Sequence, residues 1–488
     1  MNKILVLLIT LICYPLFAGD TTGVYLIKKE NLLKTDSYLA SDKLQGRLSG
    51  SEGFYSAAEF MAKNFAKLGL KPLGKDGKEY YQYFKTEFNQ IIPLCQLNII
   101  ENGKVAKKYK LGENFVCRGF SGSGHFTAPI VFVGYGFSEE GYDEYSGLDV
   151  KGKIVMMFKQ IPGWKIDEKE WKSSLRYREM IAFKKGAVAI IFVSKPNDAS
   201  PQKPIGSVLD GEGEYISEFP MVHLDLNNAD EIITKDNKSI KDLQTIIDDK
   251  KQPASYETST TVEVEVNAKY EKERTTMNVI GLLEGSDPVL KNEYLIIGAH
   301  LDHVGGQANE IFFPGANDNA SGSSAVLQIA TAFAKSERPK RSVIFILFSN
   351  EESGLNGAIY YTEHPAVPIE KTIAMFNLDC VGFGDSITVG NGKSAPDLWK
   401  IAKENDFKYT KYMIERTWNG GGADATPFHQ KGIPCLYFVT NNSYTHLHLT
   451  TDKTETLNGE LFESITRLAY ITAKTVTDGK YLRETIIQ

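Results

Sequence analysis

The most constraining feature of this chain is an unbroken apolar run, Ser342–Phe348, which is followed closely by two adjacent glutamates, Glu351 and Glu352. The run is rich in β-branched and aromatic residues, which is typical of a strand buried on both faces of a parallel sheet. Neighbouring side chains on an extended segment point in opposite directions, so one carboxylate can face a metal ion while the next faces a water. A solvated acidic turn is the simpler interpretation of such a pair taken alone.

The segment from Thr258 to the C-terminus alternates predicted strands with predicted helices. Val262, Val264 and Val266 alternate with polar residues, which indicates a half-exposed strand. Further strands are predicted at 294–299, 343–348, 373–378 and 434–439, and helices at 320–335 and 461–474. This order predicts an α/β fold with a mostly parallel sheet covered by helices.

The length of 488 residues exceeds what one ordinary core accommodates, so we expect two domains. Residues 125–257 carry their own apolar segments, with strands predicted near 130–133, 153–158, 187–193 and 220–224, and no cluster of metal-type ligands. We interpret this block as a β-rich inserted domain. The expected division is a signal peptide at 1–18, a first part of the main domain at 19–124, the insertion at 125–257, and the rest of the main domain at 258–488.

The N-terminus predicts export. Lys3 precedes the apolar segment 4–13, and Ala18 offers a cleavage point, as in a secretory signal peptide. No other apolar run approaches the roughly 20 residues that span a bilayer, so we expect no stable membrane insertion and a periplasmic or extracellular location. The net charge of −6 and the lack of a basic block argue against nucleic acid as a partner. Disulfides among Cys95, Cys117, Cys380 and Cys435, and the oligomeric state, stay open.

Residues that bind metals recur where strands of the main domain end. The five pieces contain His300 with Asp302, Asp318, Glu351 with Glu352, Asp379, and His448 with Asp452. Each piece alone is more often a cap or a loop residue, but five in one domain are hard to explain as caps, because ligands in open α/β folds gather at the carboxyl ends of strands. Two histidines and three carboxylates suit two zinc ions, and Asp318 is the best bridge because its short side chain is held near a helix start.

These motifs resemble the di-zinc exopeptidase family of the bacterial leucyl aminopeptidase type, with an inserted protease-associated domain. The matching runs are Leu39–Gly50, Gly298–Gly305, Gly315–Gly322, Asn350–Gly354, Asn377–Gly382, and His448 with Asp452. The resemblance covers nearly the whole mature chain. It implies a zinc metallopeptidase that acts on peptides and a zinc exopeptidase-like fold.

The resemblance also implies a role for each site residue. His300 and Asp379 would bind one zinc ion, Glu352 and His448 the other, and Asp318 would bridge them. Glu351 matches the general base, and Asp302 matches the carboxylate that orients His300. The Asp318–Asn319 peptide bond is expected to be cis. His446 competes with His448 as a ligand, but only His448 has the four-residue spacing to Asp452.

A glycine-rich loop, Trp418–Asp424, leads into a short helix. By resemblance, Gly421, Gly422, Asp424 and Phe428 would belong to the wall of the substrate pocket, whereas the sequence itself allows a plain turn. Acidic groups suit a substrate's free ammonium, and a carboxypeptidase would instead need an arginine near the site. Since only Arg416 approaches the glycine loop, an aminopeptidase is favoured over a carboxypeptidase or dipeptidase. A glutaminyl cyclase-like acyltransferase and a non-catalytic receptor-like protein are less favoured, because the full ligand set is present.

Overall fold

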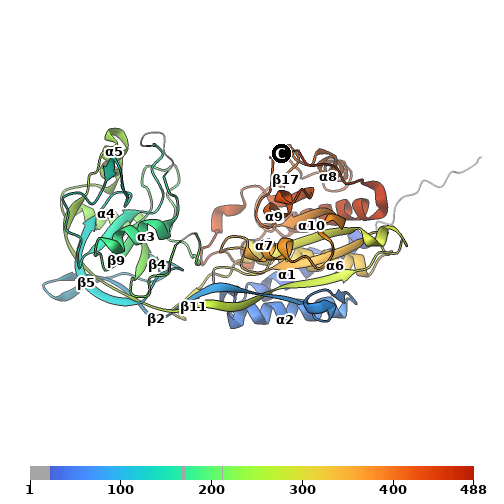
Figure 1. Cartoon of the computed structure of the whole chain (residues 1–488), viewed down its shortest axis with the longest axis horizontal. Helices are drawn as coiled ribbons and strands as arrows, with labels where there is room; N and C mark the ends of the chain where they lie inside the picture. The colour runs from blue at the N-terminus through green and yellow to red at the C-terminus, as the bar shows by residue number, and fades with distance from the viewer. Residues whose placement is uncertain (1–21, 166–170, 212, 488) are drawn as a thin grey trace, which may run out of the picture.

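The computed structural model describes residues 22–165, 171–211 and 213–487, which form two lobes joined by long strands (Figure 1). The predicted signal peptide, residues 1–18, lies outside the described residues. No helix in the described part of the chain is long and apolar enough to cross a membrane.

The larger lobe contains a sheet whose strands run in the order β17-β18-β16-β12-β15-β11. The four central strands are parallel, and β17 and β11 run antiparallel to their neighbours. The register pairs His300 of β12 with Phe348 of β15, so these two strands stop at the same edge. The bounds are β12 (Tyr294–His300), β15 (Ser342–Phe348), β16 (Thr372–Leu378), β17 (Ile387–Gly390), β18 (Cys435–Thr440) and β11 (Tyr256–Leu283).

Helices cover both faces of this sheet. One face packs against five helices in the largest core, and the other face packs against two shorter helices. The first group is α1 (Lys29–Leu39), α2 (Glu52–Lys67), α6 (Gly322–Ala334), α8 (Pro396–Tyr409) and α10 (Gly459–Thr475), and the second is α7 (Asn356–Glu363) and α9 (Ala425–Gln430). The predicted mostly parallel sheet covered by helices is confirmed.

Helix α2 shows how local sequence sets an element. The Ser51 hydroxyl accepts a hydrogen bond from the Phe54 N–H at 3.2 Å and caps the first turn. Phe54, Ala58, Met61 and Phe65 recur at helical spacing, and all are buried. The helix ends before Gly69, whose φ of +73° suits a residue without a Cβ.

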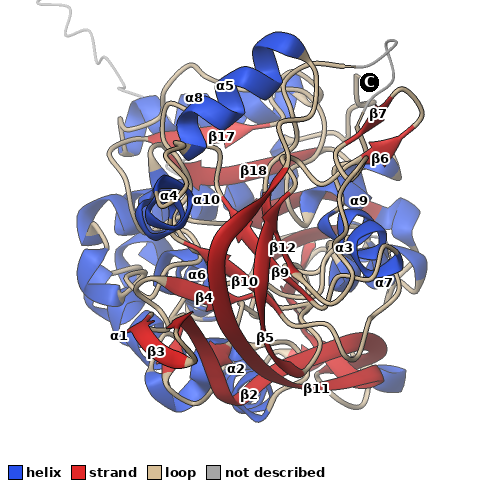
Figure 2. Cartoon of the chain, turned by 90° about the vertical axis from the view of Figure 1, so that its left-hand side faces the viewer, coloured by secondary structure: helices blue, strands red, loops and turns tan. Residues whose placement is uncertain are grey.

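The smaller lobe continues the sheet as β5-β8-β9-β10-β4, with the first four strands parallel. Figure 2 looks onto this lobe, with helices beside the strands. Its strands are β4 (Phe115–Cys117), β5 (Gly124–Phe132), β8 (Ile154–Phe158), β9 (Ala189–Val193) and β10 (Met221–Leu224), and its helices are α3 (Leu175–Lys184), α4 (Leu226–Thr234) and α5 (Ile240–Lys250). Two apolar clusters form its core.

Two long antiparallel strands, β2 (Tyr81–Glu101) and β11, connect the lobes. The end of β11, Val279–Leu283, pairs with β15, whereas its start pairs with β5 of the smaller lobe. Val262, Val264 and Val266 are buried in the smaller lobe's core, together with Leu97 of β2. The smaller lobe therefore draws residues from both sides of 125–257, the range expected for the insertion.

Short strands complete the structure, and the cysteines stay unbridged. The four cysteines within the described residues are all buried and free. The short strands are β1 (Lys71–Pro72), β3 (Lys104–Lys108), β6 (Ser138–Glu139), β7 (Tyr142–Asp143), β13 (Gly306–Gln307) and β14 (Ile311–Phe312).

Candidate metal centre

The predicted ligands meet at the carboxyl edge of the larger lobe's sheet. His300 is the last residue of β12, Asp379 follows β16, and Asp318 lies just before α6. His300 Nε2 is 3.2 Å from Asp318 Oδ1 and 3.4 Å from Asp379 Oδ1. Asp379 Oδ1 is buried and lacks a hydrogen-bond donor among the described residues. These three side chains form one group of candidate donors.

A second group shares Asp318 with the first. His448 Nε2 is 3.1 Å from Asp318 Oδ2 and 3.0 Å from Glu352 Oε2. Asp318 thus offers one oxygen to each group. Donors bound to zinc at about 2.1 Å in a tetrahedral site lie about 3.4 Å apart, which is close to these separations. The two groups fit two metal ions that share the Asp318 carboxylate.

Asp452 fixes the segment that carries Asp318. Its two carboxylate oxygens accept hydrogen bonds from the backbone N–H groups of Asn317 and Asp318, at 2.9 and 3.1 Å. The Asp318–Asn319 peptide bond is cis, as expected. His448 and Asp452 therefore belong to one loop with two functions. His448 is a candidate ligand, and Asp452 holds the backbone of a second candidate ligand, Asp318. His446 instead lies 2.9 Å from the Thr451 hydroxyl and stays outside both groups.

His303 joins the second group, and sequence reasoning missed it. Its Nδ1 is 2.7 Å from Glu352 Oε1 and 3.7 Å from Asp318 Oδ2. The ring is fully buried, and its Nε2 has no hydrogen-bond partner among the described residues. Its position three residues after His300 was the only signal in the sequence. On an extended chain that separation does not predict that both histidines approach one metal ion.

Burial and charge shift the pKa values of the centre in opposite directions. Burial alone would lower the pKa of His300, but Glu351, Asp318 and Asp379 raise it well above its usual value. Burial would raise the pKa of Glu352, but His448 and other partners lower it to about 2. The carboxylates thus stabilise positive charge in the space between them.

Among the described residues, no guanidinium donates a hydrogen bond to the carboxylates of the centre. The guanidinium of Arg47 lies nearby, but it is fully buried and donates to four backbone carbonyls instead of the carboxylates. Its acceptors are the carbonyl oxygens of Leu39, Leu301, Pro314 and Gly315. Buried charges need partners or metals, and nitrogen with carboxylate oxygen is the donor set that zinc prefers. The donor set therefore fits two zinc ions.

Glu351 lies beside the first group, close to His300 and Asp379. Its Oε2 is 3.9 Å from His300 Nε2, and burial with the nearby carboxylates Glu352 and Asp424 raises its pKa well above its usual value. Asp302 contacts His300 Nδ1 through its backbone oxygen at 3.2 Å, while its carboxylate is 3.9 Å away and accepts from the Glu351 N–H at 3.2 Å. Asp302 thus links His300 with the Glu351 backbone.

The predicted pocket residues of the glycine loop and of the helix after it differ in their surroundings. Gly421 and Gly422 have φ of +58° and +121°, and Gly422 packs against Tyr437, whose hydroxyl donates to Asp379 at 2.9 Å. Asp424 is fully buried, neither of its oxygens has a hydrogen-bond partner in the described part of the chain, and burial raises its pKa well above its usual value. Phe428 is fully buried against Phe348 and Tyr361, so it faces the core rather than a pocket.

A cavity of about 550 Å³ lies next to this loop. Tyr437 lies between this cavity and the metal centre. Its ring contacts Trp418, which lines the cavity, and its hydroxyl donates a hydrogen bond to Asp379 of the centre. Arg416 is the charged residue among the described residues that line the cavity. The lining consists of Thr388, Arg416, Trp418, Val439, Thr440, Asn441, Asn442, Ser443, Tyr444 and Thr445.

The fold and the paired donor set together describe an α/β sheet with a candidate two-metal centre at its carboxyl edge. Residues 278–473 match the sequence model described as "Peptidase family M28". This segment is therefore similar to peptidase family M28. The segment contains every predicted ligand, from His300 to His448.

Curated relatives match part of the chain. Aminopeptidase YwaD of Bacillus subtilis (strain 168) is 30% identical over 179 residues, which cover 35% of this chain and 37% of YwaD. An aminopeptidase of Pseudomonas aeruginosa (strain UCBPP-PA14) is 37% identical over 125 residues, 25% of this chain and 22% of that protein. The chain thus spans well under two thirds of the length of these relatives.

Solved structures match almost the whole chain. The aminopeptidase from Aneurinibacillus sp. strain AM-1 aligns with a TM-score of 0.65 over 96% of this chain and 99% of that one, at 21% identity. A zinc aminopeptidase from Bacillus subtilis aligns with a TM-score of 0.62 over 95% and 98%, at 20% identity. At this identity the similarity establishes the fold, including the two-lobed arrangement.

Proposed function

We propose that this protein is an exported aminopeptidase that hydrolyses the N-terminal bond of peptides with two zinc ions. The observation that carries the proposal is the bridging geometry of Asp318, with one oxygen near His300 and the other near His448. His300 and Asp379 would bind one ion and Glu352 and His448 the other, with Asp318 shared. Removal of residues 1–18 on export, with 125–257 as an insertion, belongs to the same proposal.

The chain's own residues supply the proton transfer. Two zinc ions would lower the pKa of a shared water and polarise the scissile carbonyl. Glu351 lies beside the first donor group, and the proposed ligand set does not use it, so it is free to take a proton from the water. It then returns that proton to the leaving amine. Asp302 helps to position Glu351 by accepting a hydrogen bond from its N–H.

The acidic centre favours a substrate with a free ammonium. Glu351, Asp379 and Asp424 lie close together, and Arg47 is fully buried, so it offers no guanidinium to a substrate carboxylate. The cavity beside Trp418 is suited to the substrate side chain. Arg416 in that cavity supports a second candidate, a carboxypeptidase or dipeptidase, because a guanidinium binds carboxylates well.

The test asks whether the zinc-loaded full chain cleaves substrates from the N-terminus or from the C-terminus. An aminoacyl-nitroanilide has a free N-terminus, and an N-acylated peptide has only a free C-terminus. We expect hydrolysis of the first alone, with close to two zinc ions per chain by elemental analysis. Cleavage of the N-acylated peptide alone would establish the second candidate instead.

A further inference from the structure

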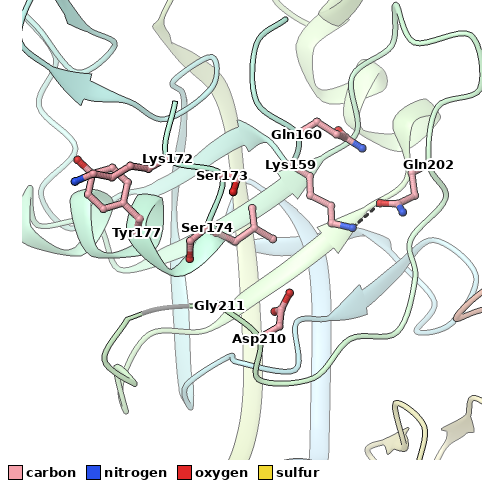
Figure 3. Close-up of a pocket in the computed structure, with 10 residues that line it drawn as sticks. Lys159, Gln160, Lys172, Ser173, Ser174, Tyr177, Gln202, Asp210 and Gly211 are labelled. Atoms are coloured by element: carbon pink, nitrogen blue, oxygen red, sulfur yellow. Dashed lines mark hydrogen bonds between the residues drawn. The ribbon is translucent and has the colours of Figure 1, made fainter. Parts of the chain in front are cut away.

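A second cavity, of about 810 Å³, lies in the smaller lobe (Figure 3). None of the candidate metal ligands lines it. It opens to solvent, since its lining residues Lys172 and Ser173 are exposed. The described lining consists of Lys159, Gln160, Lys172, Ser173, Ser174, Leu175, Tyr177, Gln202, Asp210 and Gly211.

Lys159 is a half-buried amine that forms no ion pair with a carboxylate among the described residues. It follows directly after β8, and Nζ is 2.5 Å from the side-chain oxygen of Gln202, as the dashed line in Figure 3 marks. Asp210 is the carboxylate among the described lining residues, and its charge raises the pKa of Lys159 less than burial lowers it. Burial lowers the pKa of Lys159 to about 6. A buried amine in this state gains its charge when an anion supplies the missing partner.

A second cation, Arg118, lies near Lys159, although it is not among the described residues that line the cavity. Arg118 is 2% exposed, and its Nε and Nη1 lack partners among the described residues. It acts on Lys159 electrostatically, as does Asp210, so the three charged groups lie near one another. Leu175, the first residue of the ten-residue helix α3, lines the cavity, and backbone N–H groups at a helix start attract anions. Lys172 stands at the rim, with Nζ 4.1 Å from the centre of the Tyr177 ring.

One loop joins this cavity to the metal centre. Gln202 contacts Lys159, and four residues later the Gly206 N–H donates to the backbone oxygen of His448 at 2.8 Å. Four residues span at most about 14 Å. Gln202 in the cavity wall and the residue that contacts His448 are therefore at most about 14 Å apart, which is within the length of a short peptide.

We propose that this cavity is an oxyanion-binding site, with Lys159 as its cation and the start of α3 as its N–H donor. The shared chemistry is that of a carboxylate or a phosphate, taken either from the C-terminal end of a peptide or from the free ion. The site lies outside the metal centre, and its existence does not depend on the proposed peptidase activity.

Calorimetric titration of the zinc-loaded full chain tests this proposal. The Glu351→Gln variant prevents turnover and serves as the background for all titrations. The probes are inorganic phosphate, a tetrapeptide with a free C-terminus and the same peptide with an amidated C-terminus. We expect phosphate, or the free acid in preference to the amide, to bind. We expect Lys159→Met to weaken that binding by about ten- to a hundredfold, because a charge-assisted hydrogen bond is lost.

Lys153→Met is the matched control, because Lys153 precedes the same strand at its other end and pairs with Glu257. It should leave binding unchanged. If Lys159→Met loses phosphate binding, the ligand of the site is the free ion. If Lys159→Met instead loses the preference for the free-acid peptide over the amide, the ligand is the peptide carboxylate. Binding of neither probe, or equal loss in both lysine variants, overturns the site.

A measurement on protein that keeps Lys159, in the same Glu351→Gln background, excludes misfolding of the Lys159→Met variant as the explanation. Acetylation of Lys159 followed by mass spectrometry should slow when the bound probe covers its amine, while Lys153 should react at an unchanged rate. Equal acetylation rates of Lys159 with and without saturating probe contradict the proposal.

Discussion

His303 Nδ1 lies 2.7 Å from Oε1 of Glu352, while the other oxygen of Glu352 lies 3.0 Å from His448. A buried imidazole that contacts one carboxylate oxygen leaves the second oxygen free to bind a metal. In the proposed centre His303 would therefore position Glu352, or would itself be a further donor to the same ion.

His303→Ala should weaken zinc binding at the second site by about ten- to a hundredfold, the usual effect of losing a group that orients a metal ligand. Competition with a chelator at fixed pH measures the affinity. His446→Ala is the matched control, since His446 contacts Thr451 and lies outside both donor groups. Unchanged zinc affinity in His303→Ala would remove His303 from the centre.

Glu351→Gln should retain both zinc ions and lower kcat by at least about a hundredfold, because the amide cannot carry a proton and the ligands stay in place. Elemental analysis and nitroanilide hydrolysis measure the two quantities. Glu370→Gln, a change in the short turn before β16, should affect neither. A Glu351→Gln protein that loses zinc would show that Glu351 is itself a ligand.

Arg47→Met should lower the free energy of unfolding by about 3–5 kcal/mol, because four buried carbonyl oxygens lose their donors together. Urea denaturation of the zinc-loaded protein measures the change. Arg483→Met is the control, since Arg483 also donates to three backbone carbonyls but is exposed. A loss in Arg47→Met no larger than in Arg483→Met would contradict the structural role of Arg47.

Glu179 predicts a pH dependence of stability. Burial raises its pKa to about 9, and neither carboxylate oxygen has a hydrogen-bond donor among the described residues. The folded state then holds a proton that the unfolded state releases above its pKa of about 4.3. The contribution of Glu179 to stability is therefore full at acidic pH and falls as pH rises towards 9, by up to about 1.4 kcal/mol per pH unit.

Glu179→Gln, which is neutral at every pH, should remove this slope and stabilise the protein at pH 8. Urea midpoints between pH 5 and 9 measure it. Glu113→Gln, at an exposed ion pair with Lys110, should retain the wild-type slope. If the slope persists in Glu179→Gln, another group causes it.

The sequence alone predicted the four central parallel strands of the larger lobe and the candidate ligands that lie at their ends. Periodicity located β12, β15, β16 and β18, because buried parallel strands are continuous apolar runs that differ sharply from amphipathic helices. Once those strands are parallel and adjacent, their carboxyl ends share an edge. Side chains that follow them, such as His300, Glu352 and Asp379, then meet without further information.

Only the tertiary structure revealed the contacts that depend on packing between distant segments of the chain. His303 reaches Glu352, and Arg47 spans four carbonyls, through loop conformations that no local pattern encodes. Phe428 turned to the core because α9 packs against β15 and α7, although its place after the glycine loop suggested a pocket wall. Strand β11 belongs to both lobes, because one half of its length pairs with β15 and the other with β5. Such pairings depend on residues far apart in the chain, so their energies appear only when the whole chain is folded.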